Sequence, residues 1–211
     1  MRRILVYGFS GFDEIKTNPS EQIVSSLQGI EISGNVIETT ILDVNQNSVR
    51  EFIKNIEFER YDLILGVGLN INGSKLYLEQ NADNKIIVDE QQDIICPDGS
   101  KNYQTAIKLK KVEKKMLEKD IPAQLSFSAG SYICNLAYYL SIYESEKQGF
   151  DSVLKGFIHI PPLPSTEREL RQELSSLPYN TIISGLNVFI ENAIKCQQKN
   201  TCKDRRFAQS L

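Results

Sequence analysis

The chain alternates short apolar runs with longer amphipathic stretches, and this alternation restricts its possible folds most strongly. The apolar runs cover residues 4–7, 36–42, 63–67, 123–127 and 153–160. Between them, helical spacing is found at residues 18–28, 45–57, 103–119, 131–146 and 180–197. The first helix has a typical start, because Asn18 is a capping residue and Pro19 follows it. Strands that alternate with helices predict an α/β protein whose mostly parallel sheet is covered on both faces.

The middle and the end of the chain carry weaker signals. Two β-rich runs, residues 75–78 and 85–88, flank a polar stretch and predict a hairpin in the same domain. A chain of 211 residues with 41% hydrophobic residues can build one sizeable core, so residues 1–211 are expected to form a single domain. Residues 198–211 are polar and charged and are expected to be a frayed tail.

The charge and hydropathy of the chain argue against several classes of partner. The net charge is -3 and no basic stripe is present, so no nucleic-acid partner is expected. The lysine-rich residues 108–119 read as the solvated face of a helix. No stretch approaches the ~20 apolar residues that cross a bilayer, and the apolar run at the N-terminus is too short for a signal peptide. A cytoplasmic protein with no membrane association is therefore expected.

The cysteines give no sign of a metal or redox site. Cys96, Cys134, Cys196 and Cys202 form no C-x-x-C pair, and His159 is the only histidine of the chain. A zinc site or a thioredoxin-type pair is therefore not expected, and the thiols stay free in a reducing compartment. The sequence predicts neither a metal nor a cofactor.

Cys134 is the candidate nucleophile. It follows a loop between an apolar strand and an amphipathic helix that starts near Ser131. In the first turn of a helix, the unpaired N–H groups and the positive end of the dipole favour a thiolate and accept an oxyanion. The alternative is a buried cysteine that packs as a small hydrophobic residue.

His159 and Glu79 are the candidate partners of this cysteine. His159 ends a buried strand, and imidazole is suited to taking a thiol proton near neutral pH. Glu79 lies in an otherwise apolar run and is a candidate for orienting the imidazole. A hydrogen-bonded core histidine and a surface carboxylate on an edge strand are the alternatives.

Four motifs in order then resemble those of the pyroglutamyl peptidases, also called pyrrolidone carboxyl peptidases. The resemblance covers nearly the whole chain. The motifs are Gly8-Phe9-Ser10-Gly11-Phe12 with Asn18-Pro19-Ser20, then Glu79 with Ala82 and Asn84, then Ser128-Ala129-Gly130 through Cys134-Asn135, and finally Gly156-Phe157-Ile158-His159 with Pro161 and Pro164. The resemblance implies a three-layer α/β/α sandwich of the phosphorylase/hydrolase-like kind.

The resemblance also implies an activity, removal of an N-terminal pyroglutamyl residue from peptides by a cysteine nucleophile. Cys134 would attack, His159 would act as base and then acid, and Glu79 would orient His159. The family uses no metal or cofactor, and its members are often homodimers or homotetramers. The flat, uncharged lactam ring of pyroglutamate suits an apolar slot with a few hydrogen bonds. Candidate substrate-binding residues are Phe9, Phe12, Asn18, Tyr132 and Ile133, although Phe9 and Phe12 also fit ordinary core packing.

The sequence departs from the family at three places. The family's Gly-Gln-Ala-Gly-Gly-Arg stretch is replaced by residues 68–74, and Gln80 stands where an arginine usually follows the glutamate. Asp89 occupies the position of an arginine implicated in the oxyanion region, and loss of one oxyanion donor costs ~10²–10³ in rate. Two alternatives therefore stay open. One is an impaired member that binds pyroglutamyl peptides, and the other is a related amide hydrolase with shifted specificity.

Overall fold

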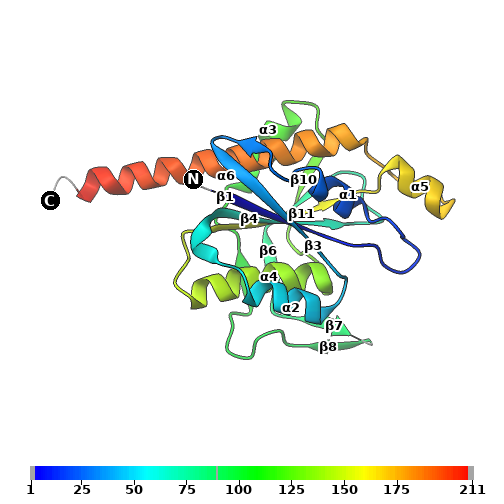
Figure 1. Ribbon diagram of the computed structural model, residues 1–211, viewed down its shortest axis with the longest axis horizontal. Helices are drawn as coiled ribbons and strands as arrows, with labels where there is room; N and C mark the ends of the chain where they lie inside the picture. Colours follow the sequence, from blue (N-terminus) through cyan, green and yellow to red (C-terminus); the bar gives the residue numbers. More distant parts are fainter. Residues whose placement is uncertain (1–2, 89, 209–211) are drawn as a thin grey trace.

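The computed structural model describes residues 3–88 and 90–208, and the side chains within them up to residue 195. A seven-stranded sheet forms the centre of the molecule, in the order β10-β5-β11-β4-β1-β3-β2 (Figure 1). Its strands are β1 (Arg3–Phe9), β2 (Glu31–Ile32), β3 (Asn35–Leu42), β4 (Tyr61–Leu69), β5 (Leu76–Glu79), β10 (Ala123–Ser126) and β11 (Leu154–Ile160).

The sheet is mixed and mostly parallel, as predicted. The four central strands β11, β4, β1 and β3 run parallel to one another. β5 is antiparallel to β11, and β10 pairs with β5 in parallel, so these two strands run opposite to the central four. β2 is a short antiparallel addition at the far edge.

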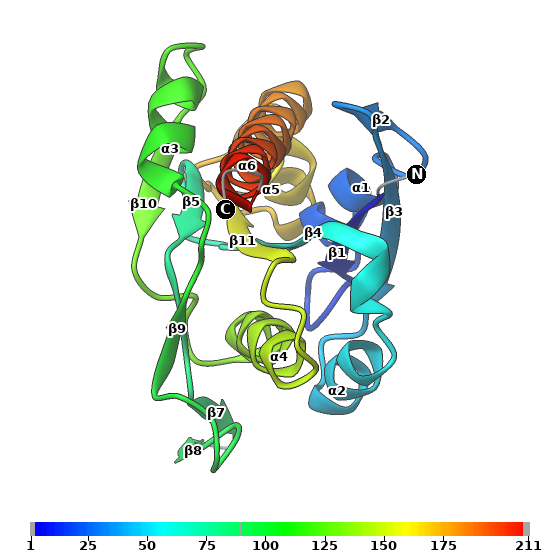
Figure 2. The ribbon, with the colours of Figure 1, turned by 90° about the vertical axis from the view of Figure 1, so that its left-hand side faces the viewer.

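Helices cover both faces of the sheet, which gives the expected three layers. Figure 2 shows α1 (Pro19–Ser25), α3 (Leu109–Leu117) and α6 (Tyr179–Ala208) on one side and α2 (Gln46–Lys54) and α4 (Ile133–Lys147) on the other. Two shorter helices are η1 (Phe58–Arg60), before β4, and α5 (Pro164–Leu170), after β11. Asn18 caps α1, because its side chain accepts a hydrogen bond from the Ser20 N–H group.

The side chains of β1 show how the two apolar layers arise. Ile4 and Val6 face the layer of α1, α3 and α6, whereas Leu5, Tyr7 and Phe9 face the layer of α2 and α4. Successive side chains of a strand point to opposite faces, so an unbroken apolar run is buried on both sides. α4 is itself buried along most of its length beneath the sheet, which explains its lack of a strongly polar face.

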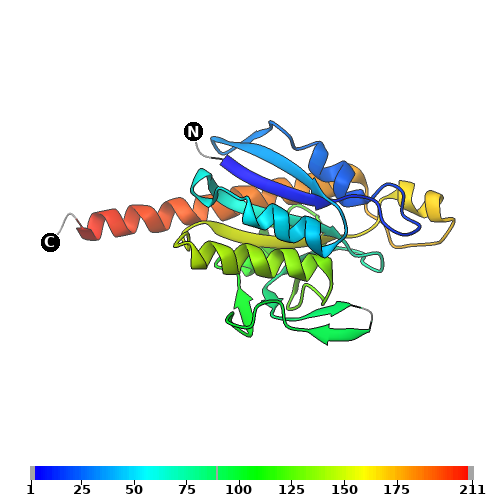
Figure 3. The ribbon, with the colours of Figure 1, turned by 60° about the horizontal axis from the view of Figure 1, so that its bottom comes forward.

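The predicted hairpin between residues 75–78 and 85–88 is wrong. β5 lies inside the main sheet, where Leu76 and Leu78 are fully buried. β7 (Ile86–Val88) pairs instead with β8 (Gln91–Asp93), and β6 (Asn81–Asp83) pairs with β9 (Asn102–Gln104). The β7–β8 ribbon projects from the α4 side of the molecule (Figure 3). Burial of two leucines in a seven-stranded sheet outweighs the local preference for a tight hairpin.

Two helix boundaries also differ from the expected ones. The helix predicted over residues 103–119 begins at Leu109, because residues 102–104 belong to β9 and Thr105, directly after them, is hydrogen-bonded to other segments. Its N–H donates to the Gln80 carbonyl at 3.1 Å, and its hydroxyl donates to the Lys155 carbonyl at 2.6 Å. The last helix, expected to end near residue 197, continues to Ala208. Within the described residues, no helix has the length and hydrophobicity needed to cross a membrane.

Lys155 is a buried cation in the layer between β11 and α4. It is 7% exposed, and its ammonium donates to the Ser145 hydroxyl at 2.9 Å. Burial lowers the pKa of this lysine to about 8, against smaller opposing effects of Glu146 and Asp151. Because the folded protein disfavours the charged form, the stability cost is complete below the folded pKa. It disappears as the pH rises from about 8 towards the pKa of an unfolded lysine, about 10.4.

We therefore expect Lys155→Met to raise the free energy of unfolding by about 1–3 kcal/mol at pH 7, since methionine fills the site without a charge to desolvate. Urea unfolding at pH 7 and pH 10 measures this effect, and the gain should shrink at the higher pH. Lys75→Met, at an exposed lysine, is the matched control and should change little. A gain that is equal at both pH values would contradict the assignment.

Candidate active site

The site is built on two glycines of β4, which face the α4 layer from alternate positions. In register, Gly66 lies between Tyr7 of β1 and Phe157 of β11. Gly68, two residues further, lies beside His159 of β11. Both glycines leave space above the sheet where another strand residue would place a side chain.

Cys134 occupies the space above Gly68. A Cβ atom on Gly68 would lie 2.7 Å from the Cys134 sulfur and 3.0 Å from Cζ of Phe157. Carbon and sulfur do not approach this closely without displacement, so any larger residue would push the thiol away from the sheet. The glycine therefore determines how deeply the cysteine sits.

The first turn of α4 presents Cys134 to the sheet. The cysteine is the second residue of the helix, as expected, and it is partly exposed. Within the described residues, no side chain caps this turn at Tyr132, so its backbone N–H groups remain available to an anion. The positive end of the helix dipole acts in the same direction and stabilises negative charge on the sulfur or on a bound oxyanion.

His159 lies beside Glu79 on neighbouring antiparallel strands. Nδ1 of His159 is 2.7 Å from Oε1 of Glu79, and the two side chains are 12% and 2% exposed. An ionised carboxylate only accepts hydrogen bonds, so Nδ1 carries the proton and Nε2 is the nitrogen left for a thiol. The imidazole also packs on the Phe157 ring, with centroids 5.0 Å apart and planes tilted by 58°. These contacts fix both the tautomer and the orientation of the ring.

Cys134 and Glu79 together control the charge of His159. Burial by itself lowers the pKa of the imidazole, because it penalises the charged form. The interactions with Cys134, and then with Glu79, outweigh burial and raise the pKa to about 10. At neutral pH the arrangement therefore favours an imidazolium between two groups that carry or can carry negative charge.

Hydrogen bonds from α4 to the backbone of neighbouring segments hold Cys134, His159 and Glu79 in position. The Asn135 side chain, fully buried, exchanges hydrogen bonds with the backbone of Asp83 and also donates to the Lys85 carbonyl. The Tyr138 hydroxyl donates to the Glu79 carbonyl at 3.2 Å. Asn135 and Tyr138 thus join α4 by hydrogen bonds to Glu79 and to the segment that follows it.

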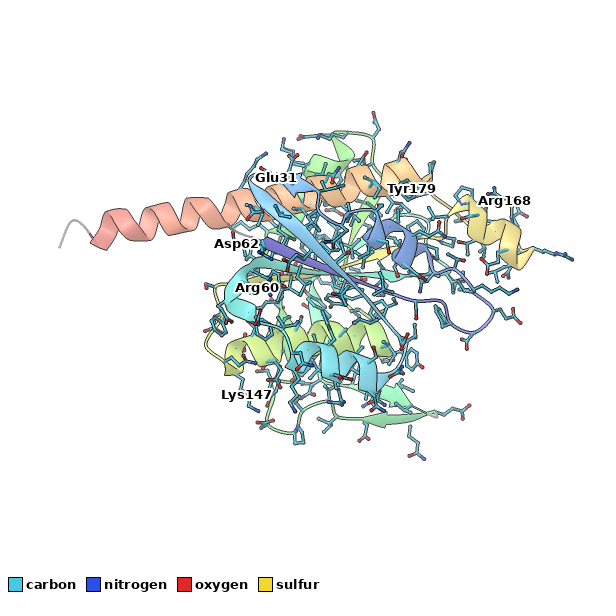
Figure 4. The ribbon with its side chains drawn as sticks, viewed as in Figure 1. Glu31, Arg60, Asp62, Lys147, Arg168 and Tyr179 are labelled. Carbon is cyan, nitrogen blue, oxygen red and sulfur yellow. The ribbon has the colours of Figure 1, made fainter. Side chains whose placement is uncertain are left out.

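Sites of open α/β sheets generally lie at the carboxyl ends of the strands, and this is true of only part of this site. In Figure 4, Asp62 and Lys147 lie towards the side of the molecule where β4 begins. Arg168 of α5 lies at the opposite side, towards which β11 runs. His159 lies near the carboxyl end of β11, as expected. β10 runs the other way, and residues 127–132 bring the chain from its end to the start of α4.

The five candidate substrate-binding residues are placed differently from one another. Phe9 and Ile133 are buried, each 2% exposed, in the apolar layer of α4. Asn18 is buried and closes the loop after β1 by donating to the Ser10 carbonyl at 3.1 Å. Phe12 is partly buried on that loop, and Tyr132 is 55% exposed at the start of α4. Only Phe12 and Tyr132 thus offer appreciable surface to a ligand in this conformation.

Some positions named from the sequence lie outside the described part of the chain. Asp89 is one of them, and the side chains of Cys196 and Cys202 are two more. The neighbouring strand is described, and the Ile87 N–H group donates to the Ser131 carbonyl at 2.7 Å, just before α4. The β7–β8 ribbon is therefore attached to the loop that precedes Cys134.

Sequence reasoning missed Gly66, Gly68 and Tyr7 as parts of the site. A signal for the glycines was present, because two glycines at alternate positions of a buried strand indicate close approach of another group. Tyr7 read only as a strand residue, and its place beside Gly66 depends on the pairing of β1 with β4. Among the described residues, no group of His, Cys, Asp and Glu side chains is arranged to hold a metal ion. A cleft of about 610 Å³ lies elsewhere, lined by residues of β3 and α2 together with Asp43 and Arg60.

Comparison with known proteins identifies the family. The family model described as "Pyroglutamyl peptidase" matches residues 2–196. The chain belongs to the pyroglutamyl peptidase family. Its motifs had suggested this family, and the match confirms it over nearly the whole chain.

Relatives and solved structures of pyroglutamyl peptidases agree with the match. The pyrrolidone-carboxylate peptidase of Pyrococcus furiosus is 34% identical over 205 residues, which are 92% of this chain and 98% of that protein. Pyrrolidone-carboxylate peptidase 1 of Saccharolobus solfataricus is 32% identical over 197 residues, covering 89% and 92%. A structure of a mutant pyrrolidone carboxyl peptidase from P. furiosus superposes with a TM-score of 0.85 at 31% identity, covering 92% and 98% of the two chains.

The close packing at Gly68 gives a direct test of this pyroglutamyl peptidase site. We expect Gly68→Ala to fold but to lose about 10²-fold or more in kcat/KM, since displacement of a reacting atom by about 1 Å costs this much. Hydrolysis of a pyroglutamyl-coumarin amide measures the loss. The matched control is Gly156→Ala, whose added Cβ would meet Phe189 at 2.9 Å on the other face of the sheet. The control should lose stability but keep its activity per folded molecule, and equal losses in both variants would contradict the assignment.

Proposed function

We propose that this member of the pyroglutamyl peptidase family is an active cysteine peptidase that removes an N-terminal pyroglutamyl residue from peptides. The observation that carries the proposal is the position of the His159 imidazole, which contacts the Glu79 carboxylate and interacts with Cys134. The names of the relatives support the choice of substrate. In this proposal Cys134 is the nucleophile, His159 the general base and acid, and Glu79 the orienting carboxylate.

Acylation uses the ion pair of Cys134 and His159. The sulfur of Cys134 attacks the carbonyl carbon of the pyroglutamyl residue, and a carbon–sulfur bond forms. Negative charge develops on the carbonyl oxygen, where the N–H groups at the start of α4 stabilise it. The imidazolium of His159 then donates its Nε2 proton to the amide nitrogen. The carbon–nitrogen bond breaks, the shortened peptide leaves with a free amino group, and a thioester remains.

Deacylation reverses these roles with water. Neutral His159 takes a proton from a water molecule, whose oxygen attacks the thioester carbon. The carbon–sulfur bond breaks, Cys134 leaves as a thiolate, and free pyroglutamate is released. Glu79 keeps Nδ1 protonated throughout, so that Nε2 alternates between base and acid.

The lactam ring is proposed to bind in an apolar slot beside Cys134. Phe9, Phe12, Tyr132 and Ile133 contribute its walls, and Asn18 holds the loop that carries Phe12. Phe12 and Tyr132 already expose surface, whereas Phe9 and Ile133 are buried and would support the ring from beneath. That loop is joined to α5 by the Lys16 N–H group, which donates to the Glu169 carboxylate at 2.6 Å.

The proposal includes the setting in which the enzyme works. Residues 1–211 act as one peptidase domain, in the cytoplasm, as a homodimer or homotetramer. Neither nucleic acid nor a membrane takes part. The net charge of -3 supports the lack of a nucleic-acid partner, and the free thiols of Cys96 and Cys134 support a reducing compartment.

Two alternatives were left open by the sequence, an impaired pyroglutamyl-binding member and an amide hydrolase of shifted specificity. Both rested on departures from the family pattern, above all at Asp89, which lies outside the described residues. The comparisons give no support to either alternative. An active peptidase is therefore the proposal to test first.

The first test is hydrolysis of a pyroglutamyl-coumarin amide with and without iodoacetamide. Cys134→Ala and His159→Ala should each abolish measurable turnover, because they remove the nucleophile or its base. Cys96→Ala removes another thiol, one that is buried in the core, and is the control that should stay active. Turnover by Cys134→Ala protein would refute the mechanism. Lack of turnover by the wild-type protein, with intact binding of pyroglutamyl peptide, would favour the impaired member.

The contribution of Glu79 to the charge of His159 predicts a change in pH dependence. The carboxylate helps to raise the pKa of the imidazole to about 10, so its removal should lower that pKa. In Glu79→Gln, the alkaline limb of kcat/KM against pH should move to lower pH, and kcat should fall by about 10²–10⁴ as the tautomer becomes less certain. The measurement is a pH profile of amide hydrolysis. An unchanged alkaline limb would show that Glu79 does not act on the imidazole.

A further inference from the structure

Tyr7 is a tyrosine buried beside the candidate active site. Its side chain is fully buried in the aromatic cluster beneath α4. The hydroxyl has no hydrogen-bond partner among the described residues. Ser141 of α4 donates its own hydroxyl proton to the Tyr138 carbonyl at 2.8 Å, so this proton is not directed at Tyr7. An unpaired buried hydroxyl costs stability, and an observed exception of this kind calls for an explanation.

The position of the hydroxyl suggests that explanation. Tyr7 pairs with Gly66 in register, and a Cβ on Gly66 would lie 2.5 Å from the Tyr7 oxygen. The Cys134 sulfur occupies the equivalent space above Gly68, 2.7 Å from its would-be Cβ. Alternate residues of a strand are about 6.6–6.8 Å apart and face the same side. The hydroxyl and the sulfur therefore fill neighbouring spaces on one face of β4.

The surroundings of Tyr7 keep it protonated. Burial, and after it the charges of Cys134 and Tyr138, raise the pKa of Tyr7 well above its ordinary value, against a smaller opposing effect of the nearby Ser141 hydroxyl. The neutral hydroxyl makes no hydrogen bond among the described residues, so its proton is free to turn towards a thiolate at Cys134. In a dry environment this dipole acts strongly on a charge, because little water is present to screen it.

We propose that the Tyr7 hydroxyl is a positioning group that stabilises the Cys134 thiolate from the sheet side, opposite the N-terminus of α4. The thiolate would then have support from two directions, the helix N–H groups above and the tyrosine O–H beside Gly66. This support is independent of any group in the β7–β8 ribbon. Tyr7 forms no bond to substrate and is not a catalytic residue in this proposal.

The titratable groups that face this region come from three elements. α4 contributes Cys134 and Tyr138, β11 contributes His159, and β5 contributes Glu79. Tyr138 donates to the Glu79 carbonyl, so its proton is directed away from the sulfur. His159 and Glu79 act on the thiolate through the imidazolium, and neither changes when the Tyr7 hydroxyl is removed. A shift caused by Tyr7 is thus separable from theirs.

The test is the pH dependence of Cys134 alkylation in Tyr7→Phe. Iodoacetamide reacts with the thiolate, and peptide mass spectrometry separates Cys134 from the other cysteines. Without the hydroxyl, the midpoint of alkylation should rise by about 0.5–1 pH unit, which lowers the rate below the midpoint by about 3–10-fold. The acid limb of kcat/KM should move by the same amount. The melting temperature should stay the same or rise, because an unpaired buried hydroxyl has been removed.

Tyr139→Phe is the matched control. Tyr139 is also fully buried on α4, but its hydroxyl donates to the Ser100 carbonyl at 2.7 Å, and Cys134 is not among the groups that act on it. This variant should leave the alkylation midpoint unchanged. A midpoint in Tyr7→Phe that stays within about 0.2 unit of the wild type, or an equal shift in Tyr139→Phe, overturns the proposal.

The inference rests on the proposed function, in which Cys134 works as a thiolate, but the two can fail separately. Alkylation needs no substrate. A protein that shows the Tyr7-dependent shift but cleaves no pyroglutamyl amide would keep this inference and refute the activity. If the wild-type and Tyr7→Phe proteins both cleave the amide with the same acid limb, the proposed activity stands and this inference is refuted.

Discussion

The absence of a side chain at Gly68 is the constraint on which the site depends. A cysteine at the start of a helix normally stands a full side-chain layer above the sheet that the helix covers. Here the helix approaches so closely that the sulfur lies only 2.7 Å from where a Cβ atom of residue 68 would be. That approach brings Cys134 into the same layer as His159, a residue of the next strand in register with the glycine. The close packing is therefore what joins a helix residue and a strand residue into one chemical unit.

The electrostatics of the site follow from the same packing. Burial removes water from the imidazole and by itself favours the neutral ring, yet the anionic partners on both sides reverse this preference. The positive charge of His159 and the negative charges beside it stabilise one another. Such mutual dependence explains why the carboxylate is more deeply buried than the histidine that it orients, since an exposed carboxylate would be screened. It also explains why one missing arginine need not disable a thiolate that has several neighbouring dipoles.

Much of this arrangement could be predicted from the sequence, because the signals are local. Asn18 and Pro19 mark a helix start, Cys134 follows a strand by one loop, and His159 is the only histidine. Non-local features could not be predicted. The reversed direction of β5 leaves no mark in its four residues, and Thr105 reads as helical until the strands that bind its backbone are known. The role of Glu79 came from family resemblance, because its partner is 80 residues away in the chain.

The antiparallel pairing of β5 with β11 has a further consequence for how faithfully the chain must fold. The pairing consists of Ile158 opposite Leu78 and His159 opposite Tyr77, so few contacts define it. A slip by one residue would turn Glu79 into the apolar layer of α6 and place a leucine beside the imidazole. Such a molecule would bury the Glu79 carboxylate without a partner and leave His159 without its hydrogen bond. The contact between Glu79 and His159 thus favours the correct alignment of β5 with β11, because a misaligned chain would be both inactive and unstable.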